Sequence, residues 1–94
     1  MNEEKILKIV AENFDRDFHI NASITSMGLL IRELIGLQGG ECDKHGVSDK
    51  MVDVSISIRM LTGALRFDSR DIEDRYAIKI NRLKHILEID DQNY

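Results

Sequence analysis

Residues 49–61, DKMVDVSISIRML, carry an apolar pattern that fits two kinds of secondary structure. Branched residues alternate with polar ones, as in a strand with one solvated face: Val52, Val54, Ile56 and Ile58. Apolar positions also recur at helical spacing, and they continue to Leu65 without a breaker stronger than Gly63. A strand would end at a turn signal after about 4–8 residues. We therefore predict a helix that is apolar on more than one face, and hence central in the fold.

The periodicity of the remaining apolar positions predicts three further helices. The first is expected at about residues 3–14 and the second at about 24–37. The last is expected to begin at Asp68 or Ser69, where Asp68 is a suitable N-cap. Its apolar stripe comprises Ile72, Tyr76, Ile80, Leu83 and Leu87.

Polar segments separate these helices. Residues 15–23 and 38–46 are expected to be connectors, the second because a pair of glycines breaks any helix. Ser48 is then the expected N-cap of the central helix, which would end near residue 66. The predicted fold is a single all-α domain, residues 1–94, with an N-terminal helix and connector at 1–20 and a flexible acidic tail at 89–94.

Composition narrows the functional classes. The chain has 94 residues, of which 43% are hydrophobic, and no Pro, which favours long uninterrupted helices. Its net charge of −4 argues against nucleic acid as a partner, because nucleic-acid-binding proteins usually carry a basic surplus. The single cysteine excludes an internal disulfide and fits a reducing compartment. The N-terminal segment shows no signal peptide and no membrane span, so we expect a cytoplasmic protein without a membrane partner.

Acidic side chains on the predicted helices are candidates for a metal site. Asp49 and Asp53 are one turn apart and share a helix face, and Glu33 lies in LLIRELIGL on the preceding helix. Acids on facing helices can hold Mg²⁺, which takes oxygen ligands and would neutralise a triphosphate. Alternatively, Asp53 faces solvent or pairs with an Arg or Lys of a neighbouring helix, and Glu33 pairs with Arg32, Lys50 or Arg59. The acids alone leave both interpretations open.

The last helix supplies cations along one side. Arg75, Lys79 and Arg82 fall at i, i+4 and i+7, so they share a face that could meet phosphates. The same spacing fits a solvated face in which Arg75 pairs with Asp71.

Three segments carry a resemblance to a known family: LLIRELIGL, DKMVDVSISIRML and the basic helix ending KINRLKHIL. Over roughly residues 27–87 the chain resembles the MazG-like all-α NTP pyrophosphohydrolases. The resemblance implies a four-helix bundle completed by dimerisation or tetramerisation. It also implies that an E-x-x-E motif and an E-x-x-D motif bind Mg²⁺ or Mn²⁺, which holds the triphosphate of a (d)NTP. Attack by water then gives the nucleoside monophosphate and pyrophosphate.

The family motifs are incomplete in this chain. Glu33 matches the first acid of E-x-x-E, and the second acid falls at Gly36. Asp53 matches the acid that ends E-x-x-D, and the first acid of that motif falls at Lys50. Asp49 partly substitutes for it, although it lies about 100° round the helix from that position. The resemblance makes Glu33 and Asp53 the catalytic candidates. It assigns metal ligation to Glu33, Asp49 and Asp53, and phosphate contacts to Lys50, Lys79 and Arg82.

Two functions are compatible with these residues. One is a magnesium-dependent (d)NTP pyrophosphohydrolase. The other is a catalytically inactive MazG-like regulator or inhibitor, for example a phage-encoded one, that binds a protein partner or a nucleotide. In the second, Lys50 takes the place of the ion and pairs with Glu33 and Asp53. Under either function we expect a homodimer or homotetramer, because the central helix is apolar on more than one face.

Overall fold

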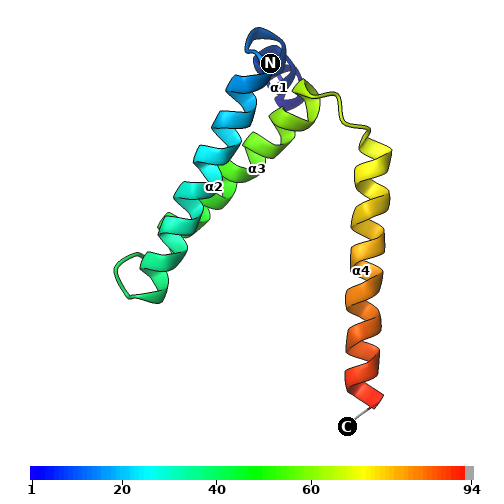
Figure 1. The fold of residues 1–94 in the computed structure, drawn as a ribbon. Coiled ribbons are helices and arrows are strands. Elements are labelled where there is room, and N and C mark those ends of the chain that lie inside the picture. Colours follow the sequence, from blue (N-terminus) through cyan, green and yellow to red (C-terminus); the bar gives the residue numbers. More distant parts are fainter. Residues whose placement is uncertain (93–94) are drawn as a thin grey trace.

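The computed structural model describes the backbone of residues 1–92 and the side chains of residues 1–88. Four helices make up the described chain, and it contains no strand, so the all-α prediction is confirmed (Figure 1). Residues 49–61, which carry both apolar patterns, lie in a helix. The elements are α1 (Glu3–Asn13), α2 (Arg16–Gln38), α3 (Lys44–Ala64) and α4 (Ser69–Gln92).

Side-chain caps set where the first three helices begin. Asn2, Asp15 and Asp43 each accept a hydrogen bond from the backbone N–H three residues on, at 2.8, 2.8 and 2.9 Å. Because Asp15 caps α2, the connector predicted at 15–23 was wrong and is helical from Arg16. Because Asp43 caps α3, that helix begins before Ser48, which was expected to cap it.

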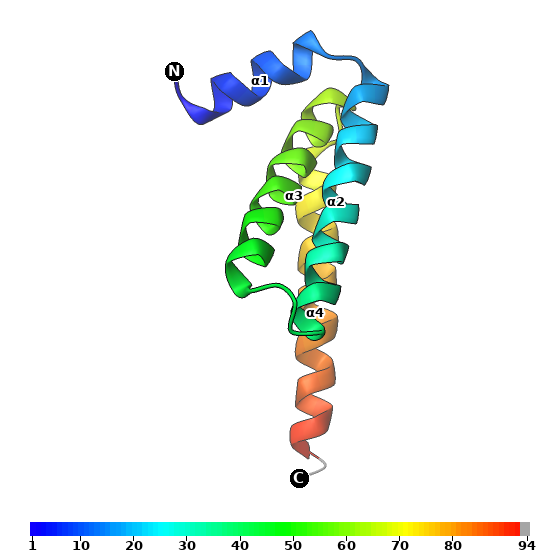
Figure 2. The same cartoon turned by 90° about the vertical axis from the view of Figure 1, so that its left-hand side faces the viewer.

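α2 and α3 form an antiparallel hairpin, and buried serines of the two helices contact each other (Figures 1 and 2). Ser23 and Ser57 are buried at 3% and 6% exposure, and the Ser26 and Ser57 hydroxyls lie 3.0 Å apart. The Ser23 hydroxyl also donates to the Ser57 carbonyl at 3.4 Å. Among the described side chains, Val47 is the one buried apolar residue, at 8% exposure. Small side chains let the two helices approach closely, but they bury little apolar surface.

α3 is the central helix, as predicted, because α1 packs across it on the side that α2 leaves free. Leu7, Val10 and Ala11 supply the half-buried contact face of α1. A Cβ added at Gly63 would lie 3.8 Å from the Ala11 Cβ, which is ordinary van der Waals contact.

The end of α3 turns the chain away from the hairpin. Phe67 N–H donates to the Thr62 carbonyl at 3.1 Å, and Arg66 N–H donates to the Gly63 carbonyl at 3.2 Å. This is a Schellman cap, with Arg66 at φ 56° in the left-handed position that usually holds glycine. Asp68 then accepts a hydrogen bond from Arg70 N–H at 2.9 Å and begins α4.

α4 stands apart from the other helices (Figure 1). It continues to Gln92, into the segment where a flexible acidic tail was predicted, and residues 93–94 lie outside the described part. The chain has a radius of gyration of 17.2 Å, against about 12 Å for a compact domain of this length. The described helices therefore do not close into a four-helix bundle within one copy.

Within residues 1–92, α2 is the one helix long and apolar enough to cross a membrane by length and composition. The sequence led us to expect no membrane span. Helices inside soluble bundles meet the same two criteria, so this feature by itself does not place the chain in a membrane.

Candidate acidic site

Glu33 lies over the first turn of α3. A Cβ added at Gly46 would come within 2.7 Å of the Glu33 Oε2, so the carboxylate fills the space that this glycine leaves open. Glu33 is half-buried. The N-terminus of α3 carries the positive end of the helix dipole, which favours a carboxylate at this place.

The position expected for the second acid of the family motif is closed. Gly36 is buried, and any Cβ there would overlap the Cys42 sulfur and lie 3.1 Å from the Cys42 Cβ. The loop is also tied to the helix, because the Gly36 carbonyl accepts from Glu41 N–H at 2.7 Å and Cys42 N–H at 3.1 Å. A glutamate at residue 36 therefore has no room in this loop conformation.

Cys42 and Glu33 interact across the same small space. The Glu33 carboxylate raises the pKa of the Cys42 thiol, because it accepts the thiol hydrogen bond and repels the thiolate. Cys42 is a free, half-buried thiol. The sequence did not reveal this pair, because it depends on how the GGECD loop folds back over Gly36.

Lys50 lies between the two aspartates of α3. Its Nζ is 3.7 Å from the Asp49 Oδ2 and 3.7 Å from the Asp53 Oδ2. The expected pair with Asp53 is therefore present. The expected pair with Glu33 is not among the ion pairs of the described side chains. Asp53 is a surface residue, with 48% of its side chain exposed, so the helix does not carry this carboxylate into an apolar interior.

The cations of α4 do not approach these acids within one copy, because α4 stands apart (Figure 1). Lys79 and Arg82 are exposed. The Arg75 guanidinium donates to the Asp71 carboxylate at 2.9 Å, and that hydrogen bond raises the pKa of Arg75. Arg75 thus follows the solvated-face interpretation, while the phosphate role of Lys79 and Arg82 stays a prediction.

The residues present do not fit a magnesium site in one copy. Mg²⁺ requires near-octahedral oxygen ligands, usually from carboxylates with water and phosphate. Here one expected acid is a glycine and another is a lysine whose ammonium contacts both Asp49 and Asp53. Among the described residues, no three His, Cys, Asp or Glu side chains are grouped as metal ligands.

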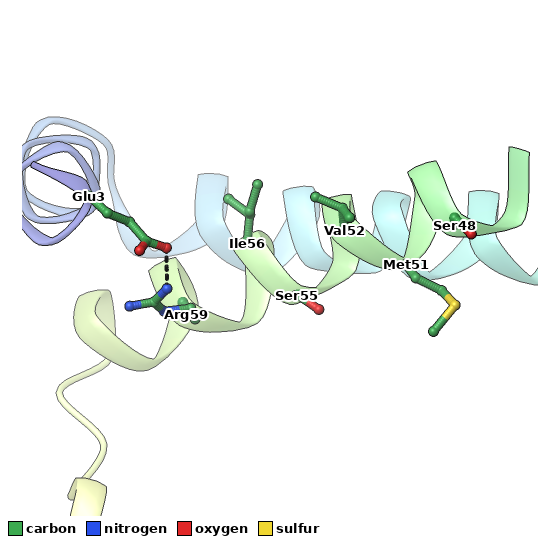
Figure 3. Close-up of a pocket in the computed structure, with 7 residues that line it drawn as sticks. All are labelled: Glu3, Ser48, Met51, Val52, Ser55, Ile56 and Arg59. Atoms are coloured by element: carbon green, nitrogen blue, oxygen red, sulfur yellow. Dashed lines mark hydrogen bonds and ion pairs between the residues drawn. The ribbon is translucent and has the colours of Figure 1, made fainter. Parts of the chain in front are cut away.

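A hollow on the outer side of α3 was not predicted from the sequence (Figure 3). Its volume is about 530 Å³, and Met51, Val52 and Ile56 form its apolar floor. The ion pair between Glu3 of α1 and Arg59 of α3 closes one end. This surface is open and suits a partner side chain or helix better than an enclosed small molecule.

His19 is a second feature that the sequence did not reveal. Its side chain is 1% exposed, and neither ring nitrogen has a hydrogen-bond partner among the described residues. Phe18 and Phe14 meet the ring edge-on, at centroid distances of 5.3 and 6.4 Å. The burial of His19 could not be predicted, because the sequence of residues 15–23 is typical of a polar connector.

Comparison of the chain with protein-family models, with curated proteins and with solved structures found no match.

Proposed function

We propose that this chain is a catalytically inactive MazG-like protein that acts as a regulator or inhibitor by binding a protein partner. The observation that carries the proposal is the position of the Lys50 ammonium, 3.7 Å from both Asp49 and Asp53. A resident cation neutralises one of the two carboxylates and repels a divalent ion from the same place. The closed position at Gly36 adds to this argument, because it removes a further ligand.

The surface of α3 supports a protein as the partner. Met51 and Val52 are 55% and 56% exposed on the floor of the hollow, where a small polar ligand would gain little. An apolar side chain from a partner would be removed from water there, and that burial is the main favourable term in protein association. We place this interaction in the cytoplasm, where Cys42 stays reduced.

The competing function is the (d)NTP pyrophosphohydrolase, in which Glu33, Asp49 and Asp53 bind the metal. One observation favours it: Glu33 on α2 and Asp53 on α3 belong to helices that pack against each other, as the family motifs require. The set of oxygen donors argues against it, because Gly36 and Lys50 stand where two of the acids are expected.

Pyrophosphate release separates the two functions. The folded protein is incubated with canonical and modified NTPs and dNTPs, with Mg²⁺ or Mn²⁺, beside a Glu33→Gln variant. We expect no release above the protein-free control from either chain. Release by the native chain that disappears in Glu33→Gln would refute the proposal and establish the enzyme.

Removing the cation tests the reason for inactivity. Lys50→Glu replaces the ammonium with the acid that the family motif expects, and Lys50→Gln is the matched neutral control. We expect added MgCl₂ to raise the melting temperature of Lys50→Glu and to leave Lys50→Gln and the native chain unchanged, because only ligands that bind the folded state stabilise it. An equal shift in all chains would show that Lys50 does not exclude the ion.

A further inference from the structure

The chain exposes two apolar helix faces that no described residue of the same copy covers. The outer face of α2, which points away from α3, has no charged member and consists of Ile24, Met27, Ile31, Leu34 and Ile35. The α4 stripe consists of Ile72, Tyr76, Ile80, Leu83 and Leu87. All ten side chains are at least 40% exposed. At 1.5 Å per residue the α2 face is about 17 Å long and the α4 stripe about 22 Å, so one can cover the other.

The two faces cannot meet within one copy. α4 stands clear of the α2–α3 hairpin, to one side of it in Figure 1 and behind it in Figure 2. The connector of residues 65–68 spans at most about 14 Å when fully extended, and its Schellman cap shortens it further. If α4 packed on the outer face of α2, its axis would lie two interhelical distances, about 16–20 Å, from the axis of α3. That separation is larger than the connector can span.

The excess surface has the size of a permanent dimer interface. The chain exposes 8007 Å², whereas a compact monomer of 10.8 kDa exposes about 5,500 Å². The excess is about 2,500 Å² per copy, or about 5,000 Å² per pair, which lies in the range of obligate homodimers. A single shallow contact would not remove it.

We propose that two copies pair reciprocally, with α4 of each copy lying along the outer face of α2 of the other. The exchange is symmetric, so each copy both donates and receives one helix, and the assembly closes as a dimer. The contact joins apolar side chains to a face without charges, so no buried charge is left unpaired. This pairing is independent of whether the acidic site is active.

Light scattering during gel filtration tests the dimer. We expect a mass of about twice 10.8 kDa for the native chain. Ile31→Glu on α2 and Ile80→Glu on α4 should each give monomers, because each buries a charge in the proposed contact. Asn81→Glu is the matched control, since residue 81 lies on the side of α4 opposite the stripe, and it should remain a dimer. A monomeric native chain would overturn the proposal.

Disulfide trapping tests which faces meet. In a Cys42→Ser background, Ile31→Cys and Ile80→Cys are introduced together, near the middle of the two faces, and the protein is oxidised. We expect a linked dimer on a non-reducing gel. A linked species of monomer size would mean that α4 folds onto its own α2, and it would overturn the exchange.

The chains with a single cysteine test the other ways in which the two apolar faces could be covered. Ile31→Cys alone and Ile80→Cys alone should give no linked dimer. In the proposed interface α2 does not meet α2 of the other copy, and α4 does not meet α4 of the other copy. Efficient linkage in either single variant would replace the exchange with a direct α2–α2 or α4–α4 contact. Flotation of the native chain with phosphatidylcholine vesicles, as a monomer, would assign the α2 face to a membrane instead.

Discussion

Gly36→Ala is the sharpest test of the contact that closes the acidic site. A Cβ at residue 36 overlaps the Cys42 sulfur and stands 3.1 Å from the Cys42 Cβ, so both atoms must retreat. The Cys42 N–H bond to the Gly36 carbonyl, at 3.1 Å, resists that retreat. Overpacking of this kind costs about 1–3 kcal/mol. The better helix propensity of alanine returns about 1 kcal/mol, so we expect a net loss of up to about 2 kcal/mol.

The measurement is urea unfolding followed by circular dichroism at 222 nm, at one fixed protein concentration. Gly63→Ala is the matched control, because its Cβ would make ordinary contact at 3.8 Å with Ala11. We expect that control to gain up to about 1 kcal/mol in the free energy of unfolding.

A second background isolates the clash. In Cys42→Gly, where the sulfur and the Cβ are both gone, Gly36→Ala should stabilise the protein by about 1 kcal/mol instead of destabilising it. If Gly36→Ala stabilised the native chain as much as Gly63→Ala does, Cys42 would not fill this space and the reasoning would fail.

Three further outcomes follow from contacts described above. Because Glu33 raises the pKa of Cys42, the folded chain holds more protons than the unfolded chain near and above the ordinary thiol value of 9.0. The free energy of unfolding should therefore fall as pH rises through that region, and Glu33→Gln should make that fall smaller. The same variant should speed alkylation of Cys42 by iodoacetamide at pH 8. An unchanged alkylation rate would disprove the link between Glu33 and the pKa of Cys42. Arg66→Gly relieves a left-handed residue at φ 56° and should raise the free energy of unfolding by about 1 kcal/mol in a urea titration, whereas a loss would mean that the arginine makes a needed contact. His19→Leu removes a buried ring without hydrogen-bond partners and should raise the melting temperature, since each unsatisfied buried group costs about 1–3 kcal/mol; a lower melting temperature would reveal a hidden partner.

The sequence predicted the helices better than their packing. The periodicity of α3 was enough to choose a helix over a strand, because the apolar positions continued past the length of a strand. The prediction of a polar connector was wrong because Asp15 is an N-cap and His19 is buried, with the stacked rings of Phe14 and Phe18 meeting it edge-on. Ser23 and Ser57 gave no signal of burial either, since serine is usually exposed.

The candidate site was predicted in part for a similar reason. Local sequence was enough to expect Lys50 beside Asp53, because residues three apart share a helix face. The contact of Cys42 with Gly36 depends on the conformation of a loop, and the direction of α4 depends on one left-handed residue, Arg66. Neither property follows from apolar periodicity.

The serine-rich contact between α2 and α3 has a consequence for how the protein is maintained in a cell. A hairpin held by small hydroxyl side chains, with Val47 as its one buried apolar residue among those described, gains little free energy from its own folding. The proposed pairing with a second copy would then supply much of the stability, so the folded fraction would depend on protein concentration. Dilute copies would be open to proteolysis, and concentrated copies would be protected. Expression level would then set the lifetime of the protein as well as its amount, so that a modest change in synthesis produces a steeper change in the folded pool.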